Sequence, residues 1–180
     1  MTSDDELMIA IRDGSTEAFE QLFERYRTRI WQFFRRRTAD RERAEELAQD
    51  TFVAVLDGAR RYEPRGSFRA FLFGVAYKVL MADHRKARHR RTEPLDVDRS
   101  AASPDPDVAL WVRAALEQLS ASDREVLMLR EYEQLSYDEI AAVRQIPLNT
   151  VRSQLFRARM AMRDALQAHA PATVRTRHGD

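Results

Sequence analysis

Apolar side chains recur at intervals of three and four residues along most of this chain of 180 residues. That spacing places them on one face of a helix, whereas a half-buried strand would alternate apolar and polar residues. No stretch alternates for long enough to predict a strand. Only five glycines and six prolines oppose helix formation. We therefore expect an all-α fold, and the spacing is clearest in the set Phe19, Leu22, Phe23, Tyr26, Ile30, Phe33 and Phe34.

One segment, residues 94–107, interrupts the helical spacing. It contains three prolines, small polar residues and several acids, without apolar periodicity. This composition is typical of a flexible or extended linker. The sequence therefore predicts two small helical domains, an amino-terminal one over 1–92 and a carboxy-terminal one over 108–170. A flexible acidic linker, 93–107, joins them, and a disordered tail follows over 171–180.

Three helices are expected in the amino-terminal domain. The first begins after a cap at Ser15 or Thr16. The second ends near Gly58, and a loop with a proline and a glycine follows it. The third helix, residues 68–91, begins apolar and finishes as a basic run.

The carboxy-terminal domain ends with the pattern of a helix-turn-helix. Ser122 with Glu125 and Ser136 with Glu139 have the spacing of capping boxes, which mark the starts of helices. Asn149 is well placed to cap the last helix, because a proline two residues earlier can hardly lie inside it. A short helix, a tight turn and a longer helix then follow one another, as in DNA-binding modules.

The last helix is expected to present an aromatic ring and guanidinium groups together. Val151, Leu155, Ala158 and Met162 form its inner stripe, and Phe156 lies away from them. In a DNA-binding helix-turn-helix, the second helix enters the major groove and contacts phosphates and base edges. A surface helix with one stray exposed ring is the alternative interpretation. The candidate DNA-binding residues are Thr150, Arg152, Ser153, Phe156 and Arg157.

Charge is segregated along the chain although the net charge is only +1. Residues 83–91 carry five Lys or Arg against one Asp, whereas residues 93–110 carry five acids against one Arg. Aromatic residues followed by a basic run suit a surface that binds unpaired bases and their backbone. A solvated basic end of a helix is the alternative. Core positions are the stronger expectation for the aromatics Phe68, Phe71, Phe73 and Tyr77.

A third pattern lies on the second helix. Glu46, Gln49, Asp50 and Val53 are spaced as one helical face, which could dock on a basic partner helix. Ordinary solvated carboxylates are the alternative. The residues expected to be buried on the rest of this helix are Leu47, Phe52, Val55 and Leu56.

Several classes of function are disfavoured by what the chain lacks. Without cysteine there are no disulfides or thiolate metal sites. The four histidines show no metal-ligand spacing, and no glycine-rich phosphate loop is present. We therefore expect no metal, no cofactor and no enzymatic activity. The start of the chain does not resemble a leader, and no apolar run approaches the ~20 residues of a membrane span. We expect a cytoplasmic protein without membrane insertion.

Together these segments resemble the bacterial sigma factors of RNA polymerase, specifically the extracytoplasmic-function (ECF) group of the sigma-70 family. Residues 18–56 look like regions 2.1 and 2.2 of the family, residues 65–91 like regions 2.3 and 2.4, and residues 115–166 like region 4. The resemblance covers nearly the whole chain. It implies a sigma factor that binds core RNA polymerase and directs promoter-specific initiation, with an anti-sigma factor as a further partner.

The resemblance also implies roles for individual residues. Region 2.2 would dock on the coiled coil of the polymerase β′ subunit through Glu46, Gln49 and Asp50. Regions 2.3 and 2.4 would melt the −10 element through Arg65, Ser67, Phe68, Lys78, Arg85 and Arg88. Region 4 would contact the β flap and read the −35 element through Thr150, Arg152, Ser153, Phe156 and Arg157.

The chain departs from the family pattern at four positions. In the family, regions 2.3 and 2.4 hold a non-template base that is flipped out of the −10 element. Lys78 stands where the group commonly has Asn, so recognition of this flipped base is expected to differ. Gln145 stands where helix-turn-helix turns usually carry Gly, so we expect a slightly reshaped turn. Phe71 stands where a Trp is common, and Gly74 stands where a larger, often basic residue is common. Both departures bear on how efficiently the chain melts DNA.

An autonomous helix-turn-helix regulator, with an amino-terminal lobe that senses a ligand or dimerises, is the alternative function. Such a regulator would bind a palindromic site as a dimer. The basic helix end and the acid-amide-acid face favour polymerase and opened DNA instead. For a sigma factor, we expect specific promoter binding only in the holoenzyme, because each domain alone offers few contacts.

Overall fold

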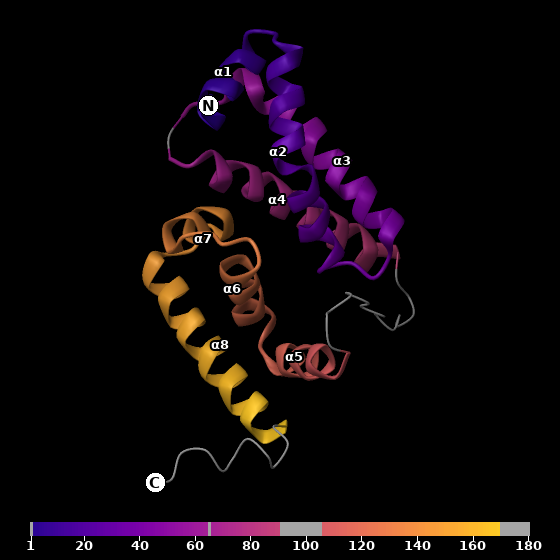
Figure 1. Ribbon diagram of the computed structural model, residues 1–180, viewed down its shortest axis with the longest axis vertical. Coiled ribbons are helices and arrows are strands. Elements are labelled where there is room, and N and C mark those ends of the chain that lie inside the picture. Colours follow the sequence, from indigo (N-terminus) through magenta and orange to yellow (C-terminus); the bar gives the residue numbers. More distant parts are fainter. Residues whose placement is uncertain (1, 65, 91–105, 170–180) are drawn as a thin grey trace. The chain divides into compact units, whose positions relative to one another are not determined.

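A computed structural model describes residues 2–64, 66–90 and 106–169 of the chain (Figure 1). Within these residues the regular structure is entirely helical, which confirms the predicted all-α fold. The chain divides into two compact units, one with the first four α-helices and one with the remaining helices, apart from the end of α7. Most of the predicted linker, the tail and Arg65 lie outside the described residues. Among the described helices, none is long and apolar enough to cross a bilayer.

The amino-terminal unit is a bundle built around α2 (Thr16–Arg35). This helix packs against α1 (Asp4–Arg12) and α3 (Arg41–Gly58), and α3 packs against α4 (Phe68–Arg90). A short 3-10 helix, η1 (Ala59–Arg61), follows α3 directly. The apolar spacing of the sequence is what builds this core, which includes the fully buried Leu22, Ile30, Phe33, Phe34, Leu47, Leu72 and Phe73.

The caps of α2 and α3 fix where these helices begin. The Ser15 side chain accepts a hydrogen bond from the Ala18 backbone amide, so of the two predicted candidates Ser15 is the cap. Asp40 caps α3 by accepting from the Glu42 amide. Each cap satisfies one of the backbone donors left open in a first helical turn. The predicted end of α3 at Gly58 is confirmed.

Helix α1 was not among the predicted elements. Ser3 and Glu6 form a capping box at its start, with hydrogen bonds in both directions between side chain and backbone. This bonding holds the pKa of Glu6 below its ordinary value. Leu7, Met8 and Ile11 bury one face of the helix. A serine three residues before a glutamate, followed by spaced apolar residues, is the local signal that marks this helix.

The carboxy-terminal unit has α8 (Leu148–His169) as its longest element. It packs against α5 (Pro106–Gln118) and α6 (Ala121–Glu131), and α7 (Tyr137–Arg144) precedes it across a tight turn. The predicted capping box of Ser136 and Glu139 is present at the start of α7. Helices α7 and α8 with their turn form the predicted helix-turn-helix.

Two predicted caps in this unit are wrong. Helix α6 is capped by Ser120, whose side chain accepts from the Asp123 amide, and not by Ser122. Close to this start, the Arg124 guanidinium donates to the carbonyls that end α5, at Leu116, Glu117 and Leu119. Asn149 does not cap α8 but lies in its first turn, where the Pro147 carbonyl accepts from the amides of the two residues after Asn149.

Candidate nucleic-acid and docking surfaces

The outward face of α8 confirms the placement predicted for Phe156. Val151, Leu155 and Ala158 are buried, and Met162 at the end of the same stripe is half-buried. The Phe156 side chain lies on the opposite side and is 67% exposed. Arg152, Ser153 and Arg157 are exposed around it, and Thr150 is half-buried. A ring exposed beside guanidinium groups has the chemistry to contact a thymine methyl while its neighbours contact phosphates and base edges.

Local hydrogen bonds order the polar side chains of this face. Arg152 donates to the side chain of Asn149, at 3.1 Å, and the Ser153 hydroxyl donates to the Asn149 carbonyl. Arg157 makes two hydrogen bonds to the Asp123 carboxylate of α6, and these bonds raise the pKa of Arg157 above its ordinary value. The face therefore presents oriented guanidinium groups, which match the geometry of phosphate and guanine acceptors.

The basic end of α4 provides a second surface. Lys78, Arg85 and Arg88 are exposed on this helix, and Ser67 is exposed just before its start. Lys78 and Arg85 are seven residues apart, so they lie on the same side of the helix. A row of cations along one helix face can follow the phosphates of a strand.

Phe68 is a core residue rather than a surface one. It is 3% exposed and its ring packs edge-on against Tyr26 and Tyr62, with ring centroids 5.5 and 6.2 Å away. Phe73 is fully buried, and Phe71 and Tyr77 are half-buried. The stronger expectation, that these aromatics build the core, holds for Phe68 and Phe73. As placed here, the Phe68 ring supports the loop before α4 and is covered against stacking on a base.

The predicted docking face of α3 is open to solvent. Glu46, Gln49 and Asp50 are exposed, and Val53 beside them is 57% exposed. Leu56 was expected to be buried, but it is 40% exposed. The expectation for Leu56 was wrong because the core covers only the side of α3 that carries Leu47, Phe52 and Val55. Apolar side chains therefore extend the acid-amide-acid face toward the end of α3.

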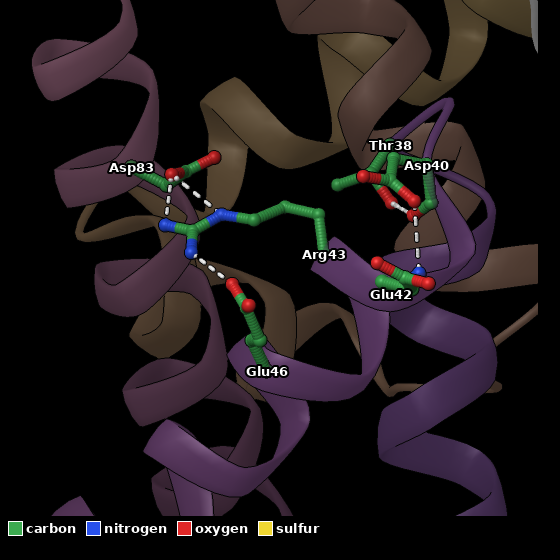
Figure 2. Close-up of polar contacts among 6 residues, drawn as sticks. All are labelled: Thr38, Asp40, Glu42, Arg43, Glu46 and Asp83. Carbon is green, nitrogen blue, oxygen red and sulfur yellow. Dashed lines mark hydrogen bonds and ion pairs between the residues drawn. The ribbon is translucent and has the colours of Figure 1, made fainter.

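Arg43 connects this docking face with the basic helix, as Figure 2 shows. Its guanidinium extends from α3 to the Asp83 carboxylate of α4 and also donates to Glu46 one turn along α3. The Asp83 side chain is only 18% exposed, and Arg43 supplies the cation beside it. Asp83 is the acid that precedes the exposed Arg85 and Arg88.

Arg43 thus neutralises a carboxylate on the helix that carries the basic run. Its bonds to Asp83 first and to Glu46 second keep the pKa of Arg43 above its ordinary value. Neither this bridge nor the pair of Asp123 and Arg157 was predicted. The partners lie 40 and 34 residues apart, so no local pattern in the sequence joins them.

Among the described residues, no cluster of three or more potential metal ligands is present.

Comparison with protein families identifies both units. The family Sigma-70 region 2 matches residues 22–91, and the family Sigma-70, region 4 matches residues 109–162. These two matches include the basic helix α4 and most of α8, on which the two candidate nucleic-acid surfaces lie. The order of the two matches along the chain is that of the two helical units.

Individual relatives match over nearly their whole length. The chain is 31% identical to the RNA polymerase sigma-H factor of Pseudomonas aeruginosa, over 91% of this chain and 94% of that protein. It is 33% identical to the RNA polymerase sigma factor CarQ of Myxococcus xanthus, over 88% and 95%. It is 32% identical to the ECF RNA polymerase sigma factor SigC of Mycobacterium tuberculosis, over 93% and 94%.

Two solved structures are similar in fold. CnrH, solved in complex with the cytosolic domain of CnrY, matches with a TM-score of 0.73 and 25% identity, over 93% of this chain and 99% of that chain. The sigma factor RpoE of Bartonella quintana, solved with the anti-sigma factor NepR, matches with a TM-score of 0.72 and 22% identity, over 86% and 100%. At that identity the second likeness shows the fold alone. From the two family matches and the relatives that match most of its length, we conclude that this chain belongs to the ECF group of the sigma-70 family of RNA polymerase sigma factors.

Proposed function

We propose that this chain binds core RNA polymerase and directs promoter-specific initiation by reading two separate DNA elements. The observation that carries this proposal is the outward face of α8, where a 67% exposed Phe156 lies among exposed arginines. Within a sigma region 4 match, such a face fits the major groove of the −35 element. Its direct contacts are proposed to be Thr150, Arg152, Ser153, Phe156 and Arg157.

The amino-terminal unit is proposed to melt and hold the −10 element. Each unstacked base costs a few kcal/mol, so a protein that opens DNA must offset that free energy by binding the parted strand. A cationic surface provides such binding, because it attracts the phosphates of the strand. Lys78, Arg85 and Arg88 of α4 supply that surface, with Ser67 at the start of the helix. We also assign Arg65 here from the family pattern. Phe68 acts from the core in this proposal, by holding the loop in place.

Docking on the polymerase is assigned to α3. The exposed Glu46, Gln49 and Asp50 would contact the coiled coil of the β′ subunit, with Val53 and Leu56 adding apolar area at the same face. The carboxy-terminal unit would contact the β flap. We place region 2 over residues 1–92 and region 4 over residues 108–170, with the acidic segment between them as their connection.

Further properties follow from this role. The protein would act in the cytoplasm, where the polymerase works, as an initiation factor without catalytic activity of its own. An anti-sigma factor is a proposed partner, since RpoE was solved with one and CnrH with the cytosolic domain of CnrY. Two weakly binding halves gain specificity when the polymerase fixes their spacing, because the second contact then forms at a high effective concentration.

The test is transcription in vitro with core polymerase and this protein on a genomic library, with start sites mapped. Wild-type protein is expected to direct initiation from a defined set of promoters that share two elements. Failure to bind core polymerase, or to initiate from any template, would overturn the proposal. Tight, sequence-specific binding to DNA without polymerase would instead favour an autonomous regulator.

Two variants separate the docking face from the DNA face. Arg157→Ala should weaken initiation that depends on the −35 element and leave competition for core polymerase intact. Asp50→Ala should do the reverse, because Asp50 lies on α3 and belongs to the other unit. If Asp50→Ala competes for core polymerase as well as the wild type, the assignment of the docking face is wrong.

A further inference from the structure

Asp123 is an acid of the first turn of α6 that reaches the recognition helix α8. Its side chain is only 12% exposed, and its two oxygens accept from Arg157 at 3.2 Å (Nε to Oδ2) and 2.8 Å (Nη2 to Oδ1). The neighbouring Ser122 accepts a hydrogen bond from the Gln154 side chain at 2.8 Å. Gln154 and Arg157 lie three residues apart on α8, so the first turn of α6 holds two side chains that are neighbours on one face of that helix.

Breaking the hydrogen bonds between Asp123 and Arg157 costs free energy. A carboxylate that is nearly buried loses much of its hydration, so it needs a charged or hydrogen-bonding partner. Within the described part of the chain, the cation paired with Asp123 is Arg157. If Arg157 turned away to meet DNA, the carboxylate would be left without that partner. Arg157 is therefore expected to stay on Asp123 when it contacts a promoter.

This arrangement fixes which side of the guanidinium faces outward. A guanidinium has five N–H donors, and the Nε and Nη2 edge is directed at Asp123. The donors of Nη1 and the remaining donor of Nη2 stay available, and the Arg157 side chain is 58% exposed. A contact with both acceptors of a guanine needs two donors in one plane, which this outer side supplies.

Two other arginines of α8, Arg159 and Arg163, are held more loosely. Arg159 pairs with Glu131, also on α6, but the Glu131 side chain is 54% exposed. Arg163 pairs with its sequence neighbour Asp164, whose side chain is 64% exposed. Carboxylates as exposed as these remain hydrated when the cation leaves, so such pairs hold a side chain only weakly. Asp123 differs from both by its low exposure.

We propose that Asp123 is a positioning residue for promoter recognition: it fixes the Arg157 guanidinium so that Arg157 discriminates between bases of the −35 element rather than supplying charge alone. This inference rests on the proposed function of α8. Its physical basis is that a long, mobile side chain loses rotamer freedom when it binds, and Asp123 removes that loss in advance. Base discrimination depends on this alignment, whereas attraction to phosphate does not.

The experiment uses holoenzyme assembled from core polymerase and the full chain. Wild-type holoenzyme first identifies a promoter from the genomic library. Templates with every single-base substitution in its −35 element then compete with the parent promoter for open-complex formation. The variants are Asp123→Asn, Arg157→Lys, the double variant, and Glu131→Gln as the matched control. Glu131→Gln removes the same charge from the same helix, also opposite an arginine of α8, but at an exposed site.

Asp123→Asn is expected to reduce the preference at the base pairs that Arg157 reads by about fivefold, and to leave the other −35 positions unchanged. Arg157→Lys keeps the charge but loses the planar fork, so it should lose the preference at the same base pairs. Asp123→Asn should add nothing in the Arg157→Lys background. Glu131→Gln should retain the wild-type preferences throughout.

Three results would overturn the proposal. The first is that Asp123→Asn keeps the wild-type base preferences. The second is that Asp123→Asn loses base preference equally at all −35 positions. The third is that Asp123→Asn has the same effect in the Arg157→Lys background as in the wild type. Thermal unfolding of each free chain shows whether a variant folds. If Asp123→Asn does not fold, Arg157→Lys is the deciding variant, because it changes an exposed side chain. Wild-type base preferences in Arg157→Lys would refute the need for a fixed fork. A wild-type holoenzyme that initiates from no template would contradict the proposed function itself.

Discussion

Gln145 lies between α7 and α8 with a φ of 52°, in the left-handed region of backbone conformation. The Ile146 amide donates to the Ala141 carbonyl and the Gln145 amide to the Ala142 carbonyl, which is the hydrogen-bond pattern of a Schellman motif. Glycine is the usual residue at this position because a Cβ is strained there. The backbone at Gln145 is thus left-handed although this residue has a Cβ, which strains that conformation.

Gln145→Gly is expected to stabilise the carboxy-terminal unit by about 0.5–1 kcal/mol, because the relief of strain exceeds the added freedom of the unfolded chain. Urea unfolding of the full chain, followed by helical circular dichroism, measures the change. Gln21→Gly is the matched control: Gln21 is exposed within α2, so the same replacement should destabilise by about 1 kcal/mol. A lower stability for Gln145→Gly would contradict the strain.

Single residues also show how far the sequence predicts the surface. The exposure of Phe156 followed from the period of one helix, because the buried stripe of α8 is narrow and clear. The exposure of Leu56 did not, because apolar residues surround much of α3 and only its packing against α2 and α4 selects the buried side. The partnership of Asp123 with Arg157 depends on how α6 and α8 pack, which no local spacing contains.

At the scale of elements, helix spacing and capping patterns predicted α2 to α8, and local caps gave the starts of α2 and α7 correctly. The start of α6 was predicted two residues late, because Ser122 with Glu125 has the spacing of a capping box whereas the actual cap is Ser120. Helix α1 is short and marginal as an isolated helix, so its apolar residues alone were a weak signal. Its capping box was the stronger one.

Helix α1 is held to its unit by two tyrosines. Tyr26 of α2 donates its phenol hydrogen to Asp4, and Tyr62 after η1 donates to Asp5. Burial, followed by these hydrogen bonds to aspartate, raises the pKa of both phenols well above the ordinary value. The folded state therefore keeps its phenol protons at a pH where the unfolded chain loses them.

The consequence is a loss of stability at alkaline pH. A raised folded pKa contributes stability that is fully present below the unfolded value of about 10 and is lost as the pH rises further. We expect the free energy of unfolding to fall above about pH 10. Tyr26→Phe together with Tyr62→Phe should make this fall shallower and should lower stability near pH 7 by about 1 kcal/mol for each lost hydrogen bond. Urea unfolding between pH 7 and 11 measures both, and an unchanged pH dependence in the double variant would contradict this account.

At the scale of the whole molecule, acidic and basic side chains are divided between different surfaces, although the net charge is only +1. In our proposal, the docking face on α3 is acidic, whereas the DNA-binding faces of α4 and α8 are basic. Arg43 lies between the acidic and basic surfaces of the amino-terminal unit and pairs with Asp83, which otherwise would repel phosphate beside the basic run. One bundle can thus present opposite charges to a polymerase and to a DNA strand.

This division predicts the salt dependence of the holoenzyme. Arg85 and Arg88 are exposed on α4, and each phosphate contact with a single strand contributes about 0.7 to the slope of log affinity against log salt. Arg85→Ala with Arg88→Ala should therefore reduce the slope for a −10 fork-junction probe by about 1.4, with affinity for core polymerase unchanged. Arg12→Ala with Arg27→Ala removes two cations from α1 and α2 that pair with neighbouring acids, Asp13 and Glu24, and should leave the slope as it is. Equal slopes for the two double variants would show that net charge, and not the row of cations on α4, determines binding to the opened strand.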